Sequence, residues 1–132
     1  MDIQLLTLLP LPILLWILIE LFRDQAIPVP LPKNTIRKML QLASVKKNEN
    51  FYDLGSGDGR TLFIATKEFG AKSTGIEKNR LLVWWTRLIV KKNNLQNKIK
   101  IIRGNIFKEN YEDADVILIY LSHKLTQELK PV

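Results

Sequence analysis

The sequence lacks cysteine altogether and holds a single histidine, His123, among its 132 residues. Without cysteine the chain can form neither a disulfide bond nor a thiolate metal site. A lone histidine is more often a structural polar residue than a catalytic base, and no HxxxH pattern or pair of carboxylates indicates a set of metal ligands. We therefore predict a protein without a metal, of a length typical of one domain.

The chain also lacks basic side chains before Arg23, and residues 3–22 lack almost every other polar group. Only Gln4, Thr7 and Glu20 interrupt an apolar run of 20 residues, about the length that crosses the ~30 Å hydrocarbon core of a bilayer. A basic n-region and a small-residue cleavage site are both missing, which argues against a cleaved signal peptide. A buried core helix is the alternative. Because basic residues begin only at Arg23, the positive-inside rule favours a single-pass anchor, residues 1–23, with the following domain on the cytoplasmic or an equivalent side.

Beyond this predicted anchor, strand-like and helix-like patterns alternate. Residues 24–34 form a linker whose three alternate prolines hold it extended. The domain, residues 35–132, begins with a helix over residues 35–43 that Asn34 is expected to cap. We predict strands over residues 50–54, 72–77, 98–103 and 115–121, and helices over residues 60–69, 80–92 and 122–130, with Gly70 and Asn79 as caps. Continuous apolar strands separated by helices predict an α/β fold with a doubly wound, mainly parallel sheet covered on both faces.

The sequence ends shortly after the fourth predicted strand. An open sheet that ended there would expose the edge of its most hydrophobic strand, which is an aggregation hazard. We therefore expect either that a partner covers this edge or that the C-terminal strands of the domain are missing.

The segment DLGSGDGR, residues 53–60, is the most informative motif. Glycines spaced by two, after a strand and before a helix, allow a sharp turn and the close approach of a ligand. Their N–H groups and the helix N-terminus are expected to face the bound molecule. A dinucleotide site is one hypothesis, but Arg60 stands where its fingerprint has the third glycine. Asp53, two residues before the first glycine, suits a cationic amino group better than a pyrophosphate.

Two further candidates follow the ends of the next predicted strands. Glu77 lies 22 residues after Gly55 and can accept both ribose hydroxyls of an adenosine, although an ordinary surface glutamate is the alternative. In GNIF, residues 104–107, Asn105 can hydrogen-bond an adenine edge while Ile106 packs on its face. Asp58 is either a ligand contact or a turn residue.

Taken together, DLGSGDGR, the acid in TGIEKN, GNIF and DVILIYL resemble the successive motifs of class I S-adenosylmethionine-dependent methyltransferases. With AIPVPLPKNTIRKML ahead of the first helix, the chain looks most similar to the crenarchaeal and the membrane-anchored mitochondrial protein-lysine methyltransferases. The resemblance covers about residues 26–131. It implies a Rossmann-like fold, S-adenosylmethionine as cofactor, and lysine side chains of a protein at or near a membrane as acceptor.

The same resemblance implies roles for individual residues. The methionine part of the cofactor would lie against Asp53, Gly55, Ser56, Gly57, Asp58 and Gly59. Glu77 would hold the ribose, and Asn105 and Ile106 the adenine. Tyr120, at the end of the fourth strand, would face the methyl group and the incoming amine as the catalytic candidate. A neutral amine would attack the methyl group in line, so that catalysis rests on positioning and desolvation rather than on a strong base.

The net charge of +7 leaves the acceptor open. A basic surface can serve nucleic acid, anionic lipid or an acidic protein, so an RNA methyltransferase is an alternative. A module that binds cofactor or a partner without catalysis is another, and an NAD oxidoreductase is disfavoured by Arg60. Trp84 and Trp85 are predicted to pack in the core, with contact to lipid or to the anchor as the alternative.

Overall fold

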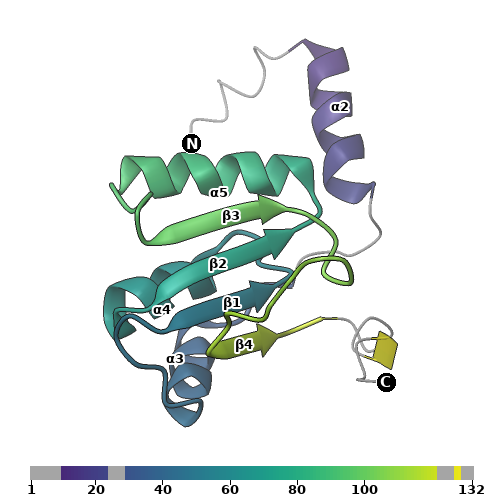
Figure 1. The fold of residues 1–132 in the computed structure, drawn as a ribbon. Helices are drawn as coiled ribbons and strands as arrows, with labels where there is room; N and C mark the ends of the chain where they lie inside the picture. The colour runs from purple at the N-terminus through teal and green to yellow at the C-terminus, as the bar shows by residue number, and fades with distance from the viewer. Residues whose placement is uncertain (1–9, 24–28, 122–126, 129–132) are drawn as a thin grey trace.

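A four-stranded parallel sheet forms the centre of the computed structural model, which describes residues 10–23, 29–121 and 127–128. The strands are β1 (Asn50–Leu54), β2 (Lys72–Glu77), β3 (Ile99–Arg103) and β4 (Val116–Ile119). Their order is β3-β2-β1-β4, and all three pairings are parallel (Figure 1). The predicted α/β fold with a parallel sheet is therefore confirmed. β1 runs beside both β2 and β4, which places the reversal of strand order directly after β1.

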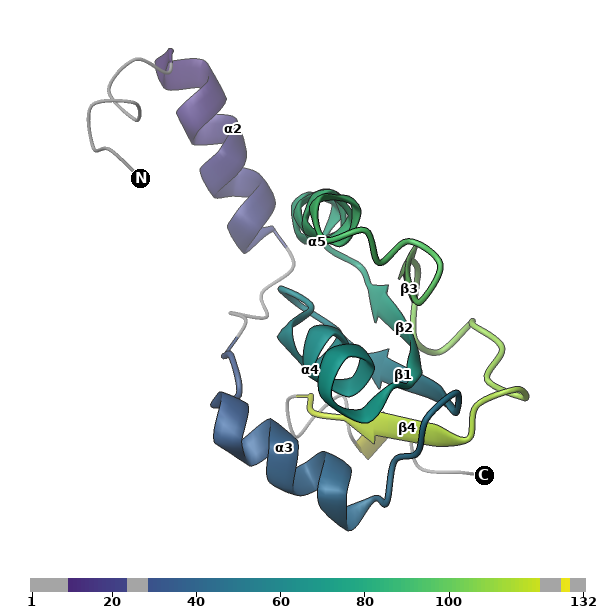
Figure 2. The same ribbon diagram turned by 90° about the vertical axis from the view of Figure 1, so that its left-hand side faces the viewer.

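Three helices cover one face of this sheet (Figure 2). They are α3 (Lys33–Leu42), α4 (Arg60–Phe69) and α5 (Arg80–Lys92). The main core lies between them and the strands, and its fully buried side chains include Ile36, Leu40, Phe51 and Leu62. Burial of these apolar side chains provides the main driving force for this packing.

The loop between β3 and β4 covers part of the other face, as Figure 2 also shows. Tyr52, Leu54 and Ile76 are buried there, with Ile106, Tyr111 and Ala114 of the loop packed against them. The rings of Tyr52 and Tyr111 meet edge to face with centroids 5.8 Å apart. The Tyr52 hydroxyl donates to the carboxylate of Asp113 at 2.8 Å. Within the described residues, this face is therefore covered by a loop rather than by the helix that a doubly wound sheet predicts.

Most predicted elements have the expected bounds. β1, β2, α4 and α5 match the prediction, while β3 and β4 are shorter. Gly70 ends α4 in the left-handed region with φ 76°, and the Asn79 side chain caps α5 by accepting from the N–H groups of Leu81 and Leu82. Of the predicted helix over residues 122–130, Gln127 and Glu128 are described and helical, whereas His123 lies outside the described residues.

Two expectations are wrong. Helix α3 begins at Lys33 because Pro32 occupies its N-cap, so Asn34 lies within the first turn and accepts from Arg37 instead of capping. Trp84 and Trp85 are 59% and 49% exposed rather than buried in the core. They lie on the side of α5 that faces away from the sheet, because Val83, Thr86 and Val90 take the inward positions.

Helix α2 (Leu11–Phe22) leaves the domain beside the N-terminus of α5 (Figure 1). The Asn79 amide donates to the backbone carbonyl of Glu20 at 3.1 Å, which ties the end of α2 to the start of α5. Among the residues that the structure describes, no helix is both long enough and apolar enough to span a membrane. Residues 1–9 of the predicted anchor and residues 24–28 of the predicted linker lie outside the described residues.

Candidate cofactor site

The candidate residues gather where the parallel strands end. β1 leads into the glycine loop and β2 ends at Glu77, while Asn105 and Tyr120 follow β3 and β4. The carboxyl ends of parallel strands share one edge of a sheet, and ligands of such sheets bind at the point where the strand order reverses. Here that point lies between β1 and β4, beside the glycine loop (Figure 1).

The glycine loop uses all three of its glycines with positive φ: 82° at Gly55, 55° at Gly57 and 78° at Gly59. A Cβ added at Gly59 would lie 2.5 Å from the Thr86 side chain, so this glycine lets α4 begin close to α5. A Cβ added at Gly57 would meet nothing within 4 Å. The loop is therefore packed at Gly59 and open at Gly57.

The N–H groups of this loop donate inside the protein. Those of Gly55 and Ser56 bond to the Ile76 carbonyl at 2.8 and 3.1 Å, and that of Gly59 to the Ser56 carbonyl at 2.9 Å. The Gly57 N–H donates to Oε2 of Glu77 at 2.9 Å. The expectation that these N–H groups face a ligand is therefore wrong, because most of them are taken up by β2. A loop whose donors are used in this way offers little to a pyrophosphate.

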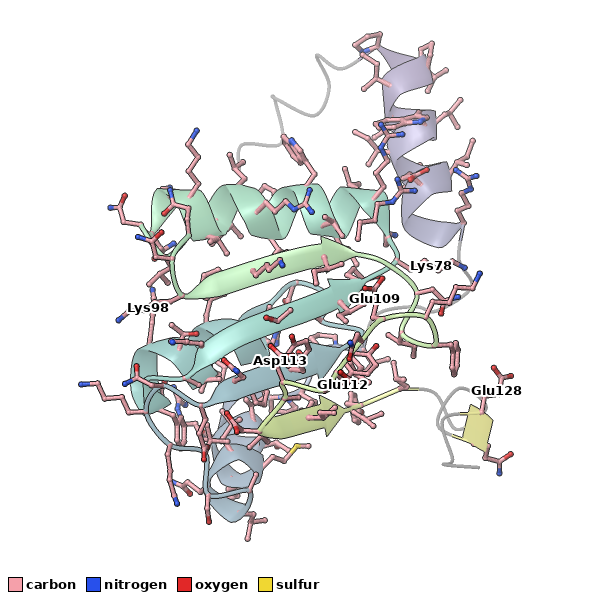
Figure 3. The ribbon with its side chains drawn as sticks, in the orientation of Figure 1. Lys78, Lys98, Glu109, Glu112, Asp113 and Glu128 are labelled. Atoms are coloured by element: carbon pink, nitrogen blue, oxygen red, sulfur yellow. The ribbon has the colours of Figure 1, made fainter. Side chains whose placement is uncertain are left out.

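Glu77 connects the loop to the start of α5. Its second oxygen, Oε1, accepts from the backbone N–H of Asn79 at 2.8 Å. Two backbone donors thus fix the carboxylate, and each of its oxygens retains acceptor capacity for another hydroxyl. An open hollow of about 230 Å³, lined by Lys78, Arg103 and Gly104, adjoins it between the ends of β2 and β3 (Figure 3 labels Lys78).

Asp53 lies deeper, on the helix side of β1. Its side chain is buried, and the pKa of its carboxyl is raised from 3.8 to about 7, mainly by this burial. A hydrogen bond from Thr61 opposes the rise, and the charges of Glu77 and Asp58 contribute to it. A buried carboxyl with so high a pKa lacks a cationic partner. A cation placed against this carboxyl would favour its ionised form.

Asp58 turns toward Arg60 instead of toward the open side of the loop. Its carboxylate meets the guanidinium at 2.6 Å and accepts from the Arg60 backbone N–H at 3.2 Å. The same guanidinium donates to the Leu31 carbonyl at 3.2 Å, which binds the segment before α3 to the glycine loop. The sequence analysis considered Arg60 only as a residue that breaks the dinucleotide fingerprint, and it missed Thr61, which lies just after the motif and bonds to Asp53.

The three candidates after β3 and β4 have no hydrogen bond to the glycine loop or to Glu77 among those that the structure describes. Asn105 is exposed, and its Oδ1 accepts from the backbone N–H of Phe107 at 3.0 Å, so its side chain is engaged in its own turn. Ile106 is half-buried against the cluster of Tyr52, Leu54 and Ile76. Tyr120 is 49% exposed after β4. Within the described ranges no group of three or more acidic, histidine or cysteine side chains could hold a metal ion.

Comparison with known proteins shows the family of this chain. A family model described as the ANTKMT methyltransferase domain matches residues 53–132. The chain belongs to this family. It is 34% identical over 104 residues to a protein-lysine N-methyltransferase of Saccharolobus islandicus, an alignment that covers 78% of this chain and 65% of the relative. A second relative, from Caenorhabditis elegans, is a lysine N-methyltransferase named for a subunit of ATP synthase; it is 33% identical over 85 residues, covering 64% of this chain and 44% of the relative.

A solved structure supports the same assignment. The fold matches that of an RNA methyltransferase from Salinibacter ruber in complex with S-adenosyl-L-homocysteine, with a TM-score of 0.75 and 36% identity, over 78% of this chain and 67% of that one. The resemblance to class I S-adenosylmethionine-dependent methyltransferases is thus confirmed. This ANTKMT-family chain spans less than two thirds of the length of the two curated relatives named above.

The matched region of this ANTKMT-family chain begins at Asp53 and includes every candidate site residue. Hydrogen bonds of Gly55, Ser56 and Gly57 join the glycine loop to the end of β2 at Ile76 and Glu77, and Asp53 lies at the end of β1, just before this loop. Asn105 and Tyr120 follow strands that end at the same edge of the sheet, but they take no part in these bonds. Their contacts to a cofactor or acceptor stay predictions.

Proposed function

We propose that this protein transfers a methyl group from S-adenosylmethionine to lysine side chains of a protein at or near a membrane. The family and both curated relatives support methylation, and the relatives' names support lysine as acceptor. The observation that carries the proposal is the pair of carboxyl groups at the ends of β1 and β2. One of them is buried and lacks a cation, and the other is fixed by two backbone donors.

The residues present fit this cofactor. Asp53 would pair with the amino group of its methionine part, and the open position at Gly57 would let that part pass close to the backbone. Glu77 would accept the two ribose hydroxyls, and Asn105 and Ile106 would contact the adenine beside the hollow near Gly104. Gly55, Ser56, Asp58 and Gly59 would shape the loop around it. Once bound, the cofactor supplies an activated methyl group.

The chain's own residues then have to place the acceptor. Tyr120 follows β4, across from the glycine loop, and its half-exposed side chain can line the approach of a neutral lysine amine. Holding the amine in line with the methyl group and excluding water would lower the barrier without a strong general base. Tyr120 is the residue through which we expect the acceptor to be oriented.

We further propose that residues 3–22 hold the protein in a membrane as a single-pass anchor, with the methyltransferase domain on the cytoplasmic or an equivalent side. Support comes from the apolar run of 20 residues and from the absence of basic residues before Arg23. In the described part of this run, the side chains of Leu11, Trp16 and Ile19 are more than half exposed.

Calorimetric titration of the full chain with S-adenosylhomocysteine tests the cofactor site. The parent is expected to bind, and Glu77→Gln to weaken binding by about tenfold or more, since it removes a charged acceptor that is worth roughly 1.5–3 kcal/mol. Glu68→Gln is the matched control, because Glu68 pairs with Arg37 on the surface of α4. A folded parent that does not bind, or a Glu77→Gln variant that binds as the parent does, contradicts the proposed site.

The acceptor is tested with methyl-labelled S-adenosylmethionine and a membrane extract. Protease-sensitive label that is lost after prior dimethylation of lysine amines supports the proposal. RNA is the second candidate, favoured by the net charge of +7 and by the name of the Salinibacter ruber structure. Label that nuclease removes, with RNA binding that falls steeply as salt rises, would establish RNA as the acceptor instead.

A further inference from the structure

Helix α5 has two apolar faces on opposite sides. The inward face, buried against the sheet, consists of Val83, Thr86 and Val90. The opposite face, which we call the outer stripe, consists of Leu81, Trp84, Trp85 and Leu88. These four positions follow the spacing i, i+3, i+4 and i+7, which aligns side chains along one side of a helix. Trp84, Trp85 and Leu88 are 59%, 49% and 47% exposed.

All charged residues of α5 are cations. Helix α5 contains Arg80, Arg87, Lys91 and Lys92 and no acidic residue. Arg80, Arg87 and Lys91 are spaced by seven and four residues and so form a row along one flank of the stripe. Arg87 reaches the Ile101 carbonyl at 2.8 Å, so this flank lies on the side of β3. An apolar stripe beside a row of cations is complementary to a layered surface that has an apolar interior and anionic groups on its outside.

Helix α2 continues this apolar surface. Its large apolar side chains that are exposed are Leu11, Ile13, Leu15, Trp16, Leu18 and Ile19. The bond between the Asn79 side chain and the Glu20 carbonyl holds the end of α2 against the start of α5. In Figures 1 and 2, α2 points away from the sheet, while α5 runs alongside β3. A bilayer that receives α2 therefore lies at the outer side of α5.

We propose that the outer stripe of α5 lies in the headgroup region of a bilayer with anionic lipids, as a second membrane contact of the methyltransferase domain. The proposal rests on the membrane association proposed for residues 3–22. Tryptophan favours the membrane interface, and cations beside an apolar helix face attract anionic headgroups. RNA would engage the cations and stack on the tryptophans, but it would gain nothing from Leu88 or from the exposed aliphatic side chains of α2. A bilayer accounts for all three features.

The three tryptophans of the chain, Trp16, Trp84 and Trp85, make the contact measurable in the full-length protein. Three single-tryptophan variants, with the other two changed to Phe, are reconstituted in vesicles whose acyl chains carry bromine near the glycerol end. One set of vesicles is phosphatidylcholine and the other contains phosphatidylglycerol as well. Tryptophan emission is quenched where the side chain meets the brominated lipid.

We expect Trp84 and Trp85 to be quenched and blue-shifted in vesicles with phosphatidylglycerol, and less so in phosphatidylcholine. Changing Arg80→Glu together with Lys91→Glu should weaken this quenching, because each cation lost near an anionic surface lowers the association about fivefold. The control is Lys38→Glu with Lys46→Glu, which changes the net charge equally on exposed residues of α3 and the following loop.

The outcomes separate this contact from the anchor. Quenched Trp16 with unquenched Trp84 and Trp85 in both kinds of vesicle overturns the outer-stripe contact and leaves the anchor in place. No quenching at any of the three positions overturns both proposals. Blue-shifted but unquenched emission from Trp84 and Trp85 means that protein covers the outer stripe. A change in this emission on addition of RNA but not of phosphatidylglycerol means that the outer stripe binds nucleic acid. Either result overturns the lipid contact.

Discussion

At the scale of single residues, Asp53 and Glu77 of the proposed cofactor site have different surroundings. Asp53 is buried beneath the first turn of α4, and its pKa is raised to about 7, mainly by burial. Glu77 is half-buried and held by two backbone donors. The buried carboxyl is therefore the group whose charge a bound cation should control.

Asp53 should make stability depend on pH. In the folded protein the Asp53 carboxyl has a pKa of about 7, whereas the ordinary pKa of an aspartate is 3.8. This contribution to the free energy of unfolding is complete below about pH 4 and is lost as pH rises through about 7. Urea unfolding of the cofactor-free protein should therefore show stability falling across this range. The Asp53→Asn variant should show a flatter curve, and an unchanged pH dependence in that variant would contradict the assignment.

The same carboxyl should couple cofactor binding to proton release. An ammonium group favours the ionised form, so binding below about pH 7 must expel the Asp53 proton. Calorimetry with S-adenosylhomocysteine in buffers of different ionisation enthalpy should detect the release of up to about one proton near pH 6. The Asp53→Asn variant is the control and should release none through this group. Equal release in both proteins would assign the proton to another group.

Gly57 and Gly59 should respond differently to alanine. Both have positive φ, which costs alanine roughly 1–2 kcal/mol. Only Gly59→Ala adds an overlap with Thr86, so we expect it to lose about 2–4 kcal/mol of unfolding free energy. Gly57→Ala should keep most of its stability but weaken S-adenosylhomocysteine binding by about tenfold, because its methyl group enters the proposed cofactor space. Urea unfolding and calorimetry together separate the two effects, and the reverse pattern would contradict this interpretation of the loop.

The role of the glycine loop also shows the limit of sequence reasoning at this scale. The spacing of glycines predicts the sharp turn correctly, and all three glycines of the loop have positive φ. It cannot predict where the N–H groups point, because the Ile76 carbonyl and the Glu77 carboxylate that accept them belong to another strand. The pairing of Asp58 with Arg60 escapes motif analysis for a related reason: two neighbouring charges can meet or diverge depending on the helix start.

At the scale of elements, local signals predict most of the sheet and the helices on one face. Gly70 marks the end of α4 and Asn79 the start of α5. The apolar pattern of the segments before, between and after these two caps then predicts α4, β2 and α5. The start of α3 is missed because a proline at the N-cap competes with the better capping residue Asn34. The exposure of Trp84 and Trp85 is missed because α5 has apolar residues on both sides, so periodicity alone cannot tell the inward face.

Asn79 joins two elements, and its two bonds can be separated. Its Oδ1 caps α5, while its amide nitrogen donates to the Glu20 carbonyl at the end of α2. Asn79→Ala should cost about 1 kcal/mol of stability and also release α2. Asn79→Ser should retain most of the cap but lose the bond to α2. Hydrogen exchange should then show faster exchange in α2 for both variants, and in the first turn of α5 for alanine only. Unchanged exchange in α2 would mean that this bond does not hold the two helices together.

At the scale of the whole molecule, the proposed cofactor would touch segments that follow all four strands. Such a ligand binds the folded chain and not the unfolded one, so it should stabilise the entire sheet rather than one loop. At a concentration of about 100 times its dissociation constant, S-adenosylhomocysteine should add about 2.7 kcal/mol to the free energy of unfolding. For a domain of about this size that corresponds to a rise in Tm of roughly 10 °C.

The expected rise in Tm has an internal control. Glu77→Gln should remove about half of it or more, since binding tenfold weaker leaves only about 1.4 kcal/mol at the same ligand concentration. Glu68→Gln should retain it, because Glu68 lies in a surface pair with Arg37. Following unfolding by both far-ultraviolet circular dichroism and tryptophan emission tests whether the sheet and α5 melt together with and without ligand. A ligand that delays only one of the two signals would stabilise a part of the molecule. A shift that survives Glu77→Gln would place the binding site away from the ends of β1 and β2, and the site proposed here would be wrong.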